Sequence, residues 1–438
     1  MNDPIQVIFS FLIFRPSPCF FTLQPPIWGA LKSNSFISPP FGEMGGKSLK
    51  NIIFAFSILL NLMREIQMVD LKAQYEKIGS EIDVAIKSVL ESTAFIKGPD
   101  VKLFEEELQE YIGAKHVVSC ANGTDALHLA MMVLDLKPGD EVITTNFTFI
   151  ATVEVVVLLG LKLVIVDPDP GSFNISFEAV KKAITPRTKV IIPVHLFGQC
   201  ADMESLMELA KKHNLFVIED AAQATGADYI FHDGTTKKAG AIGHIGTTSF
   251  FPSKNLGCYG DGGALYTNDD AFAKKLRSIA NHGMKVRYHY DDIGVNSRLD
   301  TIQAAILRVK LKYLSQFNIA RRAVADLYDE AFAGCHSITS PERVSYSSHI
   351  FHQYTIKVKD GKRDELKKFL ESKNIPSMVY YPGPLHMQEA YSYLGYKEND
   401  FPVTAALCKE VLSLPMHPDM EQEQLDYIIL NILKFFDK

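Results

Sequence analysis

The chain has 438 residues, in which 45 lysines and arginines stand against 51 aspartates and glutamates, a formal charge of −6. Hydrophobic residues make up 47% and charged residues 22%, values typical of a globular protein, which exclude wholesale disorder; the length suggests two or three domains. The slightly acidic balance argues against a general nucleic-acid binder but leaves room for one basic pocket that takes an anionic metabolite.

The six cysteines are spread along the chain, and none forms a CxxC pair or a short zinc-ligand spacing. In a chain of this length that pattern predicts free thiols in a reducing compartment. It argues against a disulfide framework and against a structural zinc site. We therefore expect a cytoplasmic protein that holds no metal.

Residues 1–62 differ from the rest of the chain, since they hold only four basic and two acidic residues. Their two apolar runs, 7–14 and 52–60, are shorter than the roughly 20 residues that span a bilayer. The stretch 47–60 faintly resembles a signal peptide, but no convincing cleavage site follows it. We expect no membrane anchor here and interpret 1–62 as a poorly structured extension translated ahead of the true start, Met63 or Met68.

From residue 72 onward the apolar spacing predicts two helices and then short apolar strands that alternate with helices. Such alternation predicts parallel βαβ units with helices on both faces of one sheet. Helices are expected at 72–91, 100–111, 126–134, 151–159, 177–184, 203–213 and 270–281. Strands are expected at 117–120, 141–144, 163–167, 189–194, 215–219 and 264–267.

A long helix predicted over 298–314 closes this region, and the remainder has a different pattern. Residues 315–438 are predicted to form a smaller α+β domain. Its expected elements are helices at 320–332 and 363–373, a strand at 352–358 and a terminal helix from 421. The domain boundary is therefore placed between 314 and 315, with a large domain over 63–314.

Ligands of a parallel sheet lie beyond the carboxyl ends of its strands, which makes the loops there candidate sites. Lys254 follows an apolar strand in a glycine-flanked loop. A lysine in an apolar pocket loses its charge more easily and can form a Schiff base with an aldehyde, although an ordinary surface lysine is the alternative. Asp220 ends a strand and could keep the pyridine nitrogen of pyridoxal phosphate protonated, or merely cap the next helix.

Two further loops suit the same cofactor. Asn122-Gly123-Thr124 joins a strand to a helix, where backbone N–H groups and a hydroxyl suit a phosphate, although a simple capped turn has the same sequence. No GxxxxGK[ST] run occurs, and no GxGxxG run follows the first strand. Phe149 could stack on a flat ring or belong to the core. Together, a phosphate cup, a stacking aromatic, an acid and a lysine predict pyridoxal phosphate.

The chain resembles the DegT/DnrJ/EryC1/StrS family of sugar aminotransferases over about residues 66–438. The resemblance is carried by Asp70-Leu-Lys, Gly98-Pro, Glu141-Val-Ile-Thr, Gly198-Gln, Glu219-Asp-Ala-Ala-Gln, Phe250-Phe-Pro-Ser-Lys, Gly294-Val-Asn-Ser-Arg-Leu-Asp and Pro382-Gly-Pro-Leu-His-Met-Gln. It implies the fold type I, aspartate aminotransferase-like architecture. The large domain would have a mostly parallel central sheet and bind the cofactor.

The resemblance also implies roles for individual residues. Lys254 would hold the cofactor and then move protons, Asp220 would pair with the pyridine nitrogen, and Gln223 would lie near the phenolic oxygen. The phosphate would be held by Gly123, Thr124 and Ser249, with Phe149 stacked on the ring.

The remaining implied roles concern the second subunit and the substrates. Asn296 would reach the phosphate from the other subunit of a homodimer with shared active sites. Arg298 would be a candidate clamp for a carboxylate, because a guanidinium binds carboxylates bidentately, with a plain structural ion pair as the alternative. Tyr381 and His386 would line the sugar-nucleotide side.

Within the family the chain most resembles UDP-2-acetamido-2-deoxy-ribo-hexuluronate aminotransferases. That likeness implies transfer of the amino group of glutamate to C3 of a UDP-linked 3-keto uronic acid, for a surface polysaccharide such as O-antigen. In the dehydratase branch a histidine replaces the lysine, so Lys254 favours transamination. Tyr380 departs from the histidine that similar sequences often carry, and 230–238 is longer than usual, consistent with an extended hairpin tip.

Two alternatives remain open. One is a dTDP-3-keto- or 4-keto-6-deoxyhexose aminotransferase, whose sugar has no carboxylate. The other is a cofactor-bound regulatory protein without turnover, which would need an attached DNA-binding domain. Residues 1–62 lack a helix-turn-helix pattern and have few basic residues, which disfavours the second alternative.

Overall fold

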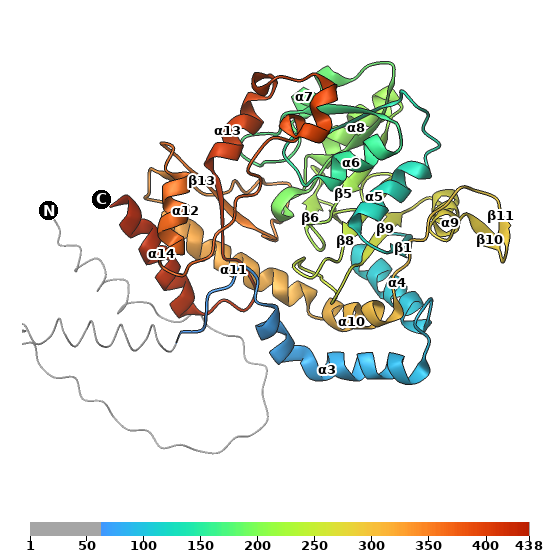
Figure 1. The fold of residues 1–438 in the computed structure, drawn as a ribbon, viewed down its shortest axis with the longest axis horizontal. Coiled ribbons are helices and arrows are strands. Elements are labelled where there is room, and N and C mark those ends of the chain that lie inside the picture. Colours follow the sequence, from blue (N-terminus) through green and yellow to red (C-terminus); the bar gives the residue numbers. More distant parts are fainter. Residues whose placement is uncertain (1–62, 438) are drawn as a thin grey trace, which may run out of the picture. The chain divides into compact units, whose positions relative to one another are not determined.

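The computed structural model describes residues 63–437, so the expectations for 1–62 lie outside the described part of the chain. Residues Met63–Lys438 form one compact unit. Its centre is a seven-stranded sheet (Figure 1) in the order β1 (His116–Cys120), β9 (Gly263–Thr267), β8 (Ile245–Ser249), β5 (Phe216–Asp220), β4 (Thr188–Ile192), β2 (Glu141–Thr145) and β3 (Lys162–Val166). Only β9 runs antiparallel to its neighbours, which confirms the predicted mostly parallel sheet.

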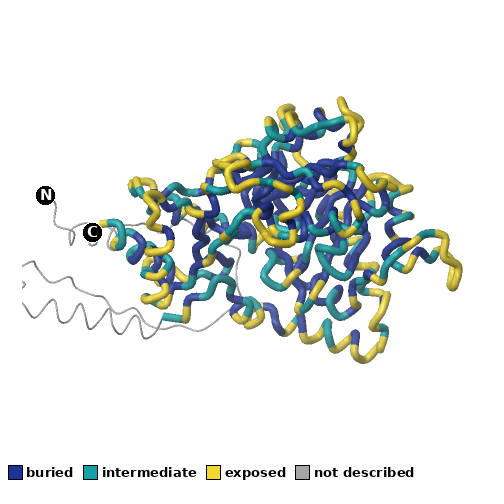
Figure 2. The backbone as a smooth tube through the Cα atoms, turned by 45° about the horizontal axis from the view of Figure 1, so that its top comes forward, coloured by how far each residue is buried: buried dark blue, intermediate teal, exposed yellow. Residues whose placement is uncertain are grey.

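Helices cover both faces of this sheet because successive side chains of a strand point to opposite faces. In β4, Val190 and Ile192 pack in the cluster that holds residues of α5, α6 and α9, whereas Ile191 packs with residues of α7 and α8. The helices of this region are α3 (Leu71–Ser92), α4 (Pro99–Ile112), α5 (Gly123–Met132), α6 (Ala151–Leu158), α7 (Phe177–Ala183), α8 (Met203–His213), α9 (Asp270–Ile279) and α10 (Thr301–Leu311). In Figure 2 the dark blue, buried residues gather in the interior of the molecule, and most residues of the seven strands are buried.

The predicted long helix over 298–314 is wrong at its start. Asp300 has extended backbone, φ −68° and ψ 143°, and α10 begins only at Thr301. The cause is a tertiary contact, because Ile96 forms an antiparallel bridge with Asp300. Asp300 is thereby kept in an extended conformation beside the loop that precedes α4.

The C-terminal region has its own three-stranded antiparallel sheet and its own core. Its elements are α11 (Leu314–Phe332), β12 (Ile338–Thr339), β13 (Tyr354–Val358), α12 (Arg363–Glu371), α13 (Pro402–Glu410), β14 (Val411–Leu414) and α14 (Gln422–Phe436). Its core cluster draws on residues 324–432 and on Ile66 from the start of the described chain. The domain boundary between residues 314 and 315 stays a prediction. The separate core of the C-terminal region supports it.

Two hairpins extend from these layers. One joins β6 (Asp228–Ile230) to β7 (Thr236–Lys238), where the sequence predicted a hairpin tip. The other joins β10 (Met284–Val286) to β11 (His289–Tyr290) and lies beyond α9 in Figure 1. Among the residues 63–437, no helix is both long enough and apolar enough to cross a bilayer.

The core of the small sheet gives a stability test. Ile356 on β13 is fully buried, so Ile356→Ala should lower the free energy of unfolding by about 2–5 kcal/mol through lost burial and a cavity. Ile319 on α11 is 57% exposed, and Ile319→Ala should change stability by less than about 0.5 kcal/mol. Urea unfolding measures both, and equal losses would contradict the assigned core.

Candidate functional site

Strand β5 ends in two adjacent buried carboxylates, Glu219 and Asp220, which point to opposite faces of the sheet. Asp220 accepts a hydrogen bond of 2.8 Å from the hydroxyl of Thr152 and one of 3.2 Å from the N–H of Ala222. Burial raises the pKa of Asp220 above its ordinary value, although these hydrogen bonds and the charge of Lys254 act against the rise. The site therefore holds a carboxylate that gains from a cationic partner.

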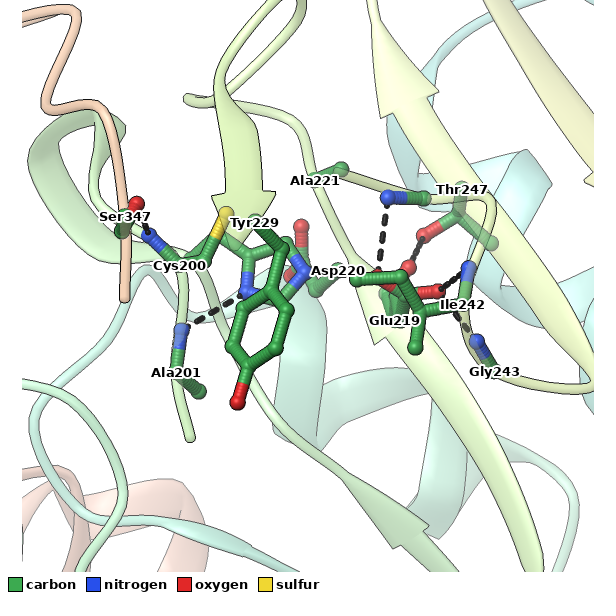
Figure 3. Close-up of polar contacts among 12 residues, drawn as sticks. Cys200, Ala201, Glu219, Asp220, Ala221, Tyr229, Ile242, Gly243, Thr247 and Ser347 are labelled. Carbon is green, nitrogen blue, oxygen red and sulfur yellow. Dashed lines mark hydrogen bonds and ion pairs between the residues drawn. The ribbon is translucent and has the colours of Figure 1, made fainter. Parts of the chain in front are cut away.

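Glu219 is the anchor of this strand end (Figure 3). Its side chain accepts hydrogen bonds from the backbone N–H groups of Gly240, Ile242 and Gly243 and lies 2.8 Å from Nε2 of the buried His195. Burial alone would raise the pKa of Glu219, but His195 and the backbone donors outweigh it and hold the pKa below its ordinary value. Nδ1 of His195 accepts from the N–H of Ala201, so Nε2 carries the proton that Glu219 binds.

Lys254 lies in the loop that follows β8, and β8 is the strand that pairs with β5. Burial lowers its pKa to about 8, and the nearby carboxylate of Asp220 acts in the opposite direction. The next residue, Asn255, is buried and donates a hydrogen bond of 2.7 Å to Asn318 of α11. This loop therefore presents an amine that is readily neutralised, the state in which a lysine attacks an aldehyde.

A tight cup lies where β1 passes into α5. The side chain of Asn122 caps the helix by accepting from the N–H of Asp125 at 2.8 Å, and α5 begins at Gly123. A Cβ on Gly123 would lie 2.6 Å from the Cβ of Ser249. Among the described residues, no protein acceptor takes the N–H of Gly123 or Thr124. The helix start, with its free N–H groups, suits a phosphate.

The structure brings several other predicted residues to this region. Gln223 accepts at Oε1 from the N–H of Phe197 at 2.8 Å and donates to the hydroxyl of Tyr381 at 3.2 Å. Phe149, 56% exposed, stands free in the loop after β2, as a residue that stacks on a ligand must. His386 is buried, with Nδ1 2.7 Å from the amide of Asn146.

Asn296 and Arg298 flank Ser297, which attaches their segment to the cup. The Ser297 hydroxyl donates to Asp125 at 2.6 Å and accepts from the N–H of Ala121 at 3.1 Å. Asn296 itself is exposed. Arg298 donates one hydrogen bond of 3.3 Å to Asn281, and within residues 63–437 it forms no ion pair. The structural ion pair considered as the alternative role for Arg298 is therefore not formed within the described part of the chain.

The residues present fit pyridoxal phosphate. A buried acid, a lysine with a lowered pKa and a glycine cradle at a helix start match its pyridine nitrogen, aldehyde and phosphate. Sequence reasoning missed two supports of this site, Thr152 and His195. Thr152 lay in the predicted helix 151–159 and His195 directly after the predicted strand 189–194, and only the fold reveals their carboxylate partners. Among residues 63–437, no group of His, Cys, Asp and Glu could hold a metal ion.

Comparisons with known proteins agree with this geometry. Residues 76–433 match the model of the DegT/DnrJ/EryC1/StrS aminotransferase family. The chain is 47% identical to a pleiotropic regulatory protein of Geobacillus stearothermophilus, covering 85% of this chain and 98% of that one. It is 44% identical to a UDP-2-acetamido-2-deoxy-3-oxo-D-glucuronate aminotransferase of Pseudomonas aeruginosa (83% and 98% covered). It is 40% identical to a dTDP-3-amino-3,4,6-trideoxy-alpha-D-glucose transaminase of Streptomyces venezuelae (82% and 93%).

Solved structures give the same picture. The crystal structure of DesV from S. venezuelae in complex with a ketimine intermediate has a TM-score of 0.82 and 38% identity, and covers 86% of this chain and 100% of that one. The structure of NtdA from Bacillus subtilis with bound PMP has a TM-score of 0.76 and 32% identity (85% and 83% covered). The predicted fold is therefore confirmed.

The lowered pKa of Lys254 predicts how cofactor-free enzyme captures pyridoxal phosphate. Because only the neutral amine attacks an aldehyde, a pKa of about 8 should make the rate rise about tenfold between pH 7 and pH 9. The absorbance of the covalent lysine adduct measures the rate, with Nα-acetyl-lysine as the control. In Asp220→Asn the midpoint should move lower. A midpoint near 10.5, the ordinary lysine value, would contradict the assigned environment.

The glycine cradle predicts a second effect. In Gly123→Ala the new methyl group meets Ser249, and such overpacking costs about 1–3 kcal/mol, so cofactor affinity should fall at least about fivefold. Gly334→Ala is the control, because nothing lies within 4 Å of a Cβ there. Fluorescence titration with pyridoxal phosphate measures affinity. Unchanged affinity in Gly123→Ala would exclude the cup as the phosphate site.

Proposed function

Because the chain belongs to the DegT/DnrJ/EryC1/StrS aminotransferase family, we propose that it transfers the amino group of glutamate to the C3 keto group of a UDP-linked 2-acetamido-3-keto uronic acid. The chain is a pyridoxal phosphate-dependent aminotransferase that acts on nucleotide-linked keto sugars. The specific sugar, the amino donor and the use of the product in a surface polysaccharide such as O-antigen are the proposed parts.

One observation carries the choice of a uronic acid. Arg298 stands at a cavity wall with no carboxylate partner among the described residues, although a guanidinium binds a carboxylate bidentately. The hydrogen bonds of Ser297 to Asp125 and Ala121 hold the neighbouring Arg298 next to the phosphate cup. Both proposed substrates carry a carboxylate. The 44% identity to the UDP-2-acetamido-2-deoxy-3-oxo-D-glucuronate aminotransferase of P. aeruginosa supports the same choice.

Each cofactor residue has a task that follows from its contacts. Pyridoxal phosphate, when bound, supplies an electron sink for the carbon that loses a proton. Asp220, kept from water, would hold the proton on the ring nitrogen, and Gln223 would orient the phenolic oxygen. Gly123, Thr124 and Ser249 would hold the phosphate and Phe149 would cover the ring. Lys254, released by the amino donor, would carry the proton between carbon atoms, for which a pKa of about 8 is well suited.

We also propose a cytoplasmic homodimer in which Asn296 completes the partner's phosphate site. The support is the exposed apolar surface near Asn296. Three apolar residues of the β10–β11 hairpin and the segment after it are exposed: Val286 (63%), Tyr288 (71%) and Ile293 (90%). Exposed apolar residues that are grouped in this way are typical of a protein–protein interface. Tyr381 and His386 are proposed to line the sugar-nucleotide side.

A dTDP-keto-6-deoxyhexose is the second candidate, favoured by the 40% identical transaminase of S. venezuelae and by Tyr380, a departure on the sugar side. A regulatory role without turnover is suggested by the name of the G. stearothermophilus relative. The match of residues 76–433 to an aminotransferase family favours turnover, and the lysine and the acid that transamination needs, Lys254 and Asp220, are both present.

A half-reaction experiment tests the substrate. The enzyme is converted to its pyridoxamine form with glutamate, freed of glutamate and mixed with one keto sugar at a time. The UDP-linked 3-keto uronic acid should restore the absorbance of the lysine-bound cofactor, whereas dTDP-keto-6-deoxyhexoses should not. In Arg298→Ala the rate with the uronate should fall at least about tenfold, because a charge-assisted hydrogen bond is lost.

Arg298→Lys is the matched control, since it keeps the positive charge but loses the planar guanidinium. Its rate with the uronate should lie between those of the wild-type enzyme and Arg298→Ala. Restoration by a deoxyhexose alone would keep the enzyme class and overturn the proposed sugar. If Lys254→Ala kept the absorbance of the lysine-bound cofactor, the assignment of Lys254 would be overturned.

A further inference from the structure

A cavity of about 490 Å³ lies beside the phosphate cup, and its walls come from segments far apart in the sequence. The start of α4 and the loop before it supply Lys97 and Lys102, and α9 supplies Arg277. The segment after the β10–β11 hairpin supplies Ser297 and Arg298. Because Ser297 is bonded to the cup loop at Ala121, the cavity adjoins the candidate cofactor site.

The backbone places Lys97 next to Arg298. The N–H of Thr301 donates to the carbonyl of Phe95 at 3.0 Å, and the N–H of Gly98 donates to the Thr301 hydroxyl at 3.0 Å. Together with the Ile96–Asp300 bridge, these bonds clamp the loop of Lys97 onto the start of α10. Lys97 has φ +53°, in the left-handed region that lysine rarely adopts, and such strain is concentrated at functional sites.

The charges of the cavity do not balance. Its lining holds four cations, Lys97, Lys102, Arg277 and Arg298, against two carboxylates, Glu105 and Glu106. Glu105 binds Arg277 at 2.8 Å, and Glu106 lies 3.6 Å from Lys102.

Lys97 and Arg298 are left without an ion pair among the residues 63–437. Burial, Arg298 and Arg277 lower the pKa of Lys97 and outweigh the opposite effect of Glu105, the direction expected of a cation that faces mainly other cations. A bound anion would relieve this repulsion.

We propose that Lys97 and Arg298 form a two-cation subsite that takes an oxyanion of the nucleotide sugar. The oxyanion is either the C6 carboxylate of a uronic acid or the diphosphate, and in both cases two converging cations bind it better than one. Lys97 is thus a specificity-determining residue that the family motifs did not single out. The carboxylate form of this inference rests on the proposed function.

Calorimetry of the cofactor-loaded enzyme tests the subsite without turnover, because the probes carry no ketone. The probes are UDP-N-acetylglucosamine, which has a neutral C6, and its uronic acid, which has a carboxylate there. Lys97→Met should weaken binding of the uronic acid at least about tenfold, while Lys97→Arg should restore it. Met keeps a Cβ and the length of the chain, so the strain at φ +53° is unchanged.

Lys102→Met is the matched control, since it removes one charge from the same wall but from a residue paired with Glu106, and it should change affinity less than twofold. A loss confined to the uronic acid assigns the subsite to the carboxylate, and an equal loss for both probes assigns it to the diphosphate. A wild-type enzyme that prefers the neutral probe overturns the proposed uronate substrate alone. The proposed subsite is overturned if Lys97→Met binds both probes as tightly as the wild-type enzyme does. It is also overturned if the wild-type enzyme binds neither probe.

Discussion

The buried carboxylate of Glu219 is the constraint on which the rest of the site depends. It satisfies three backbone N–H groups of the turn 240–243 and the ring of His195, all in the interior of the sheet. A buried charge is tolerated only when it is fully paired, so β5 can end in one position only. Since Asp220 is the next residue, the same network that anchors Glu219 aims Asp220 at the opposite face.

The strands beside β5 are tied at the same level, which brings the chemistry together. The N–H of Asp220 donates to Pro193 after β4, and the N–H of Ala221 donates to Thr247 of β8. The loop of Lys254 leaves β8 two residues later, and the cup of Gly123 abuts the end of that strand at Ser249. An acid, an amine and a phosphate cup therefore converge because parallel strands end at one edge.

The substrate side is built differently, from segments that no single sheet edge collects. The loop before α4 and the extended residues before α10 pair with one another, and Ser297 joins them to the cup. These contacts replace what would otherwise be a continuation of α10. The lost helical turn places Arg298 at a cavity wall beside Lys97, so a departure from helical propensity coincides with the proposed recognition of an anion.

The sequence by itself determined the alternation of strands and helices, the mostly parallel sheet and the placement of Lys254, Asp220, Gly123 and Phe149 at or just after the ends of strands. Periodicity reports which face of an element is buried, and the end of a strand marks the site edge. Only the tertiary structure decided which groups lie together. Thr152 binds Asp220, and His195 binds Glu219. Lys97 and Arg298, which are about 200 residues apart in the sequence, line the same cavity. Such pairs depend on the order of strands and on how loops are clamped, and hydrophobic pattern carries no information about partners across the fold.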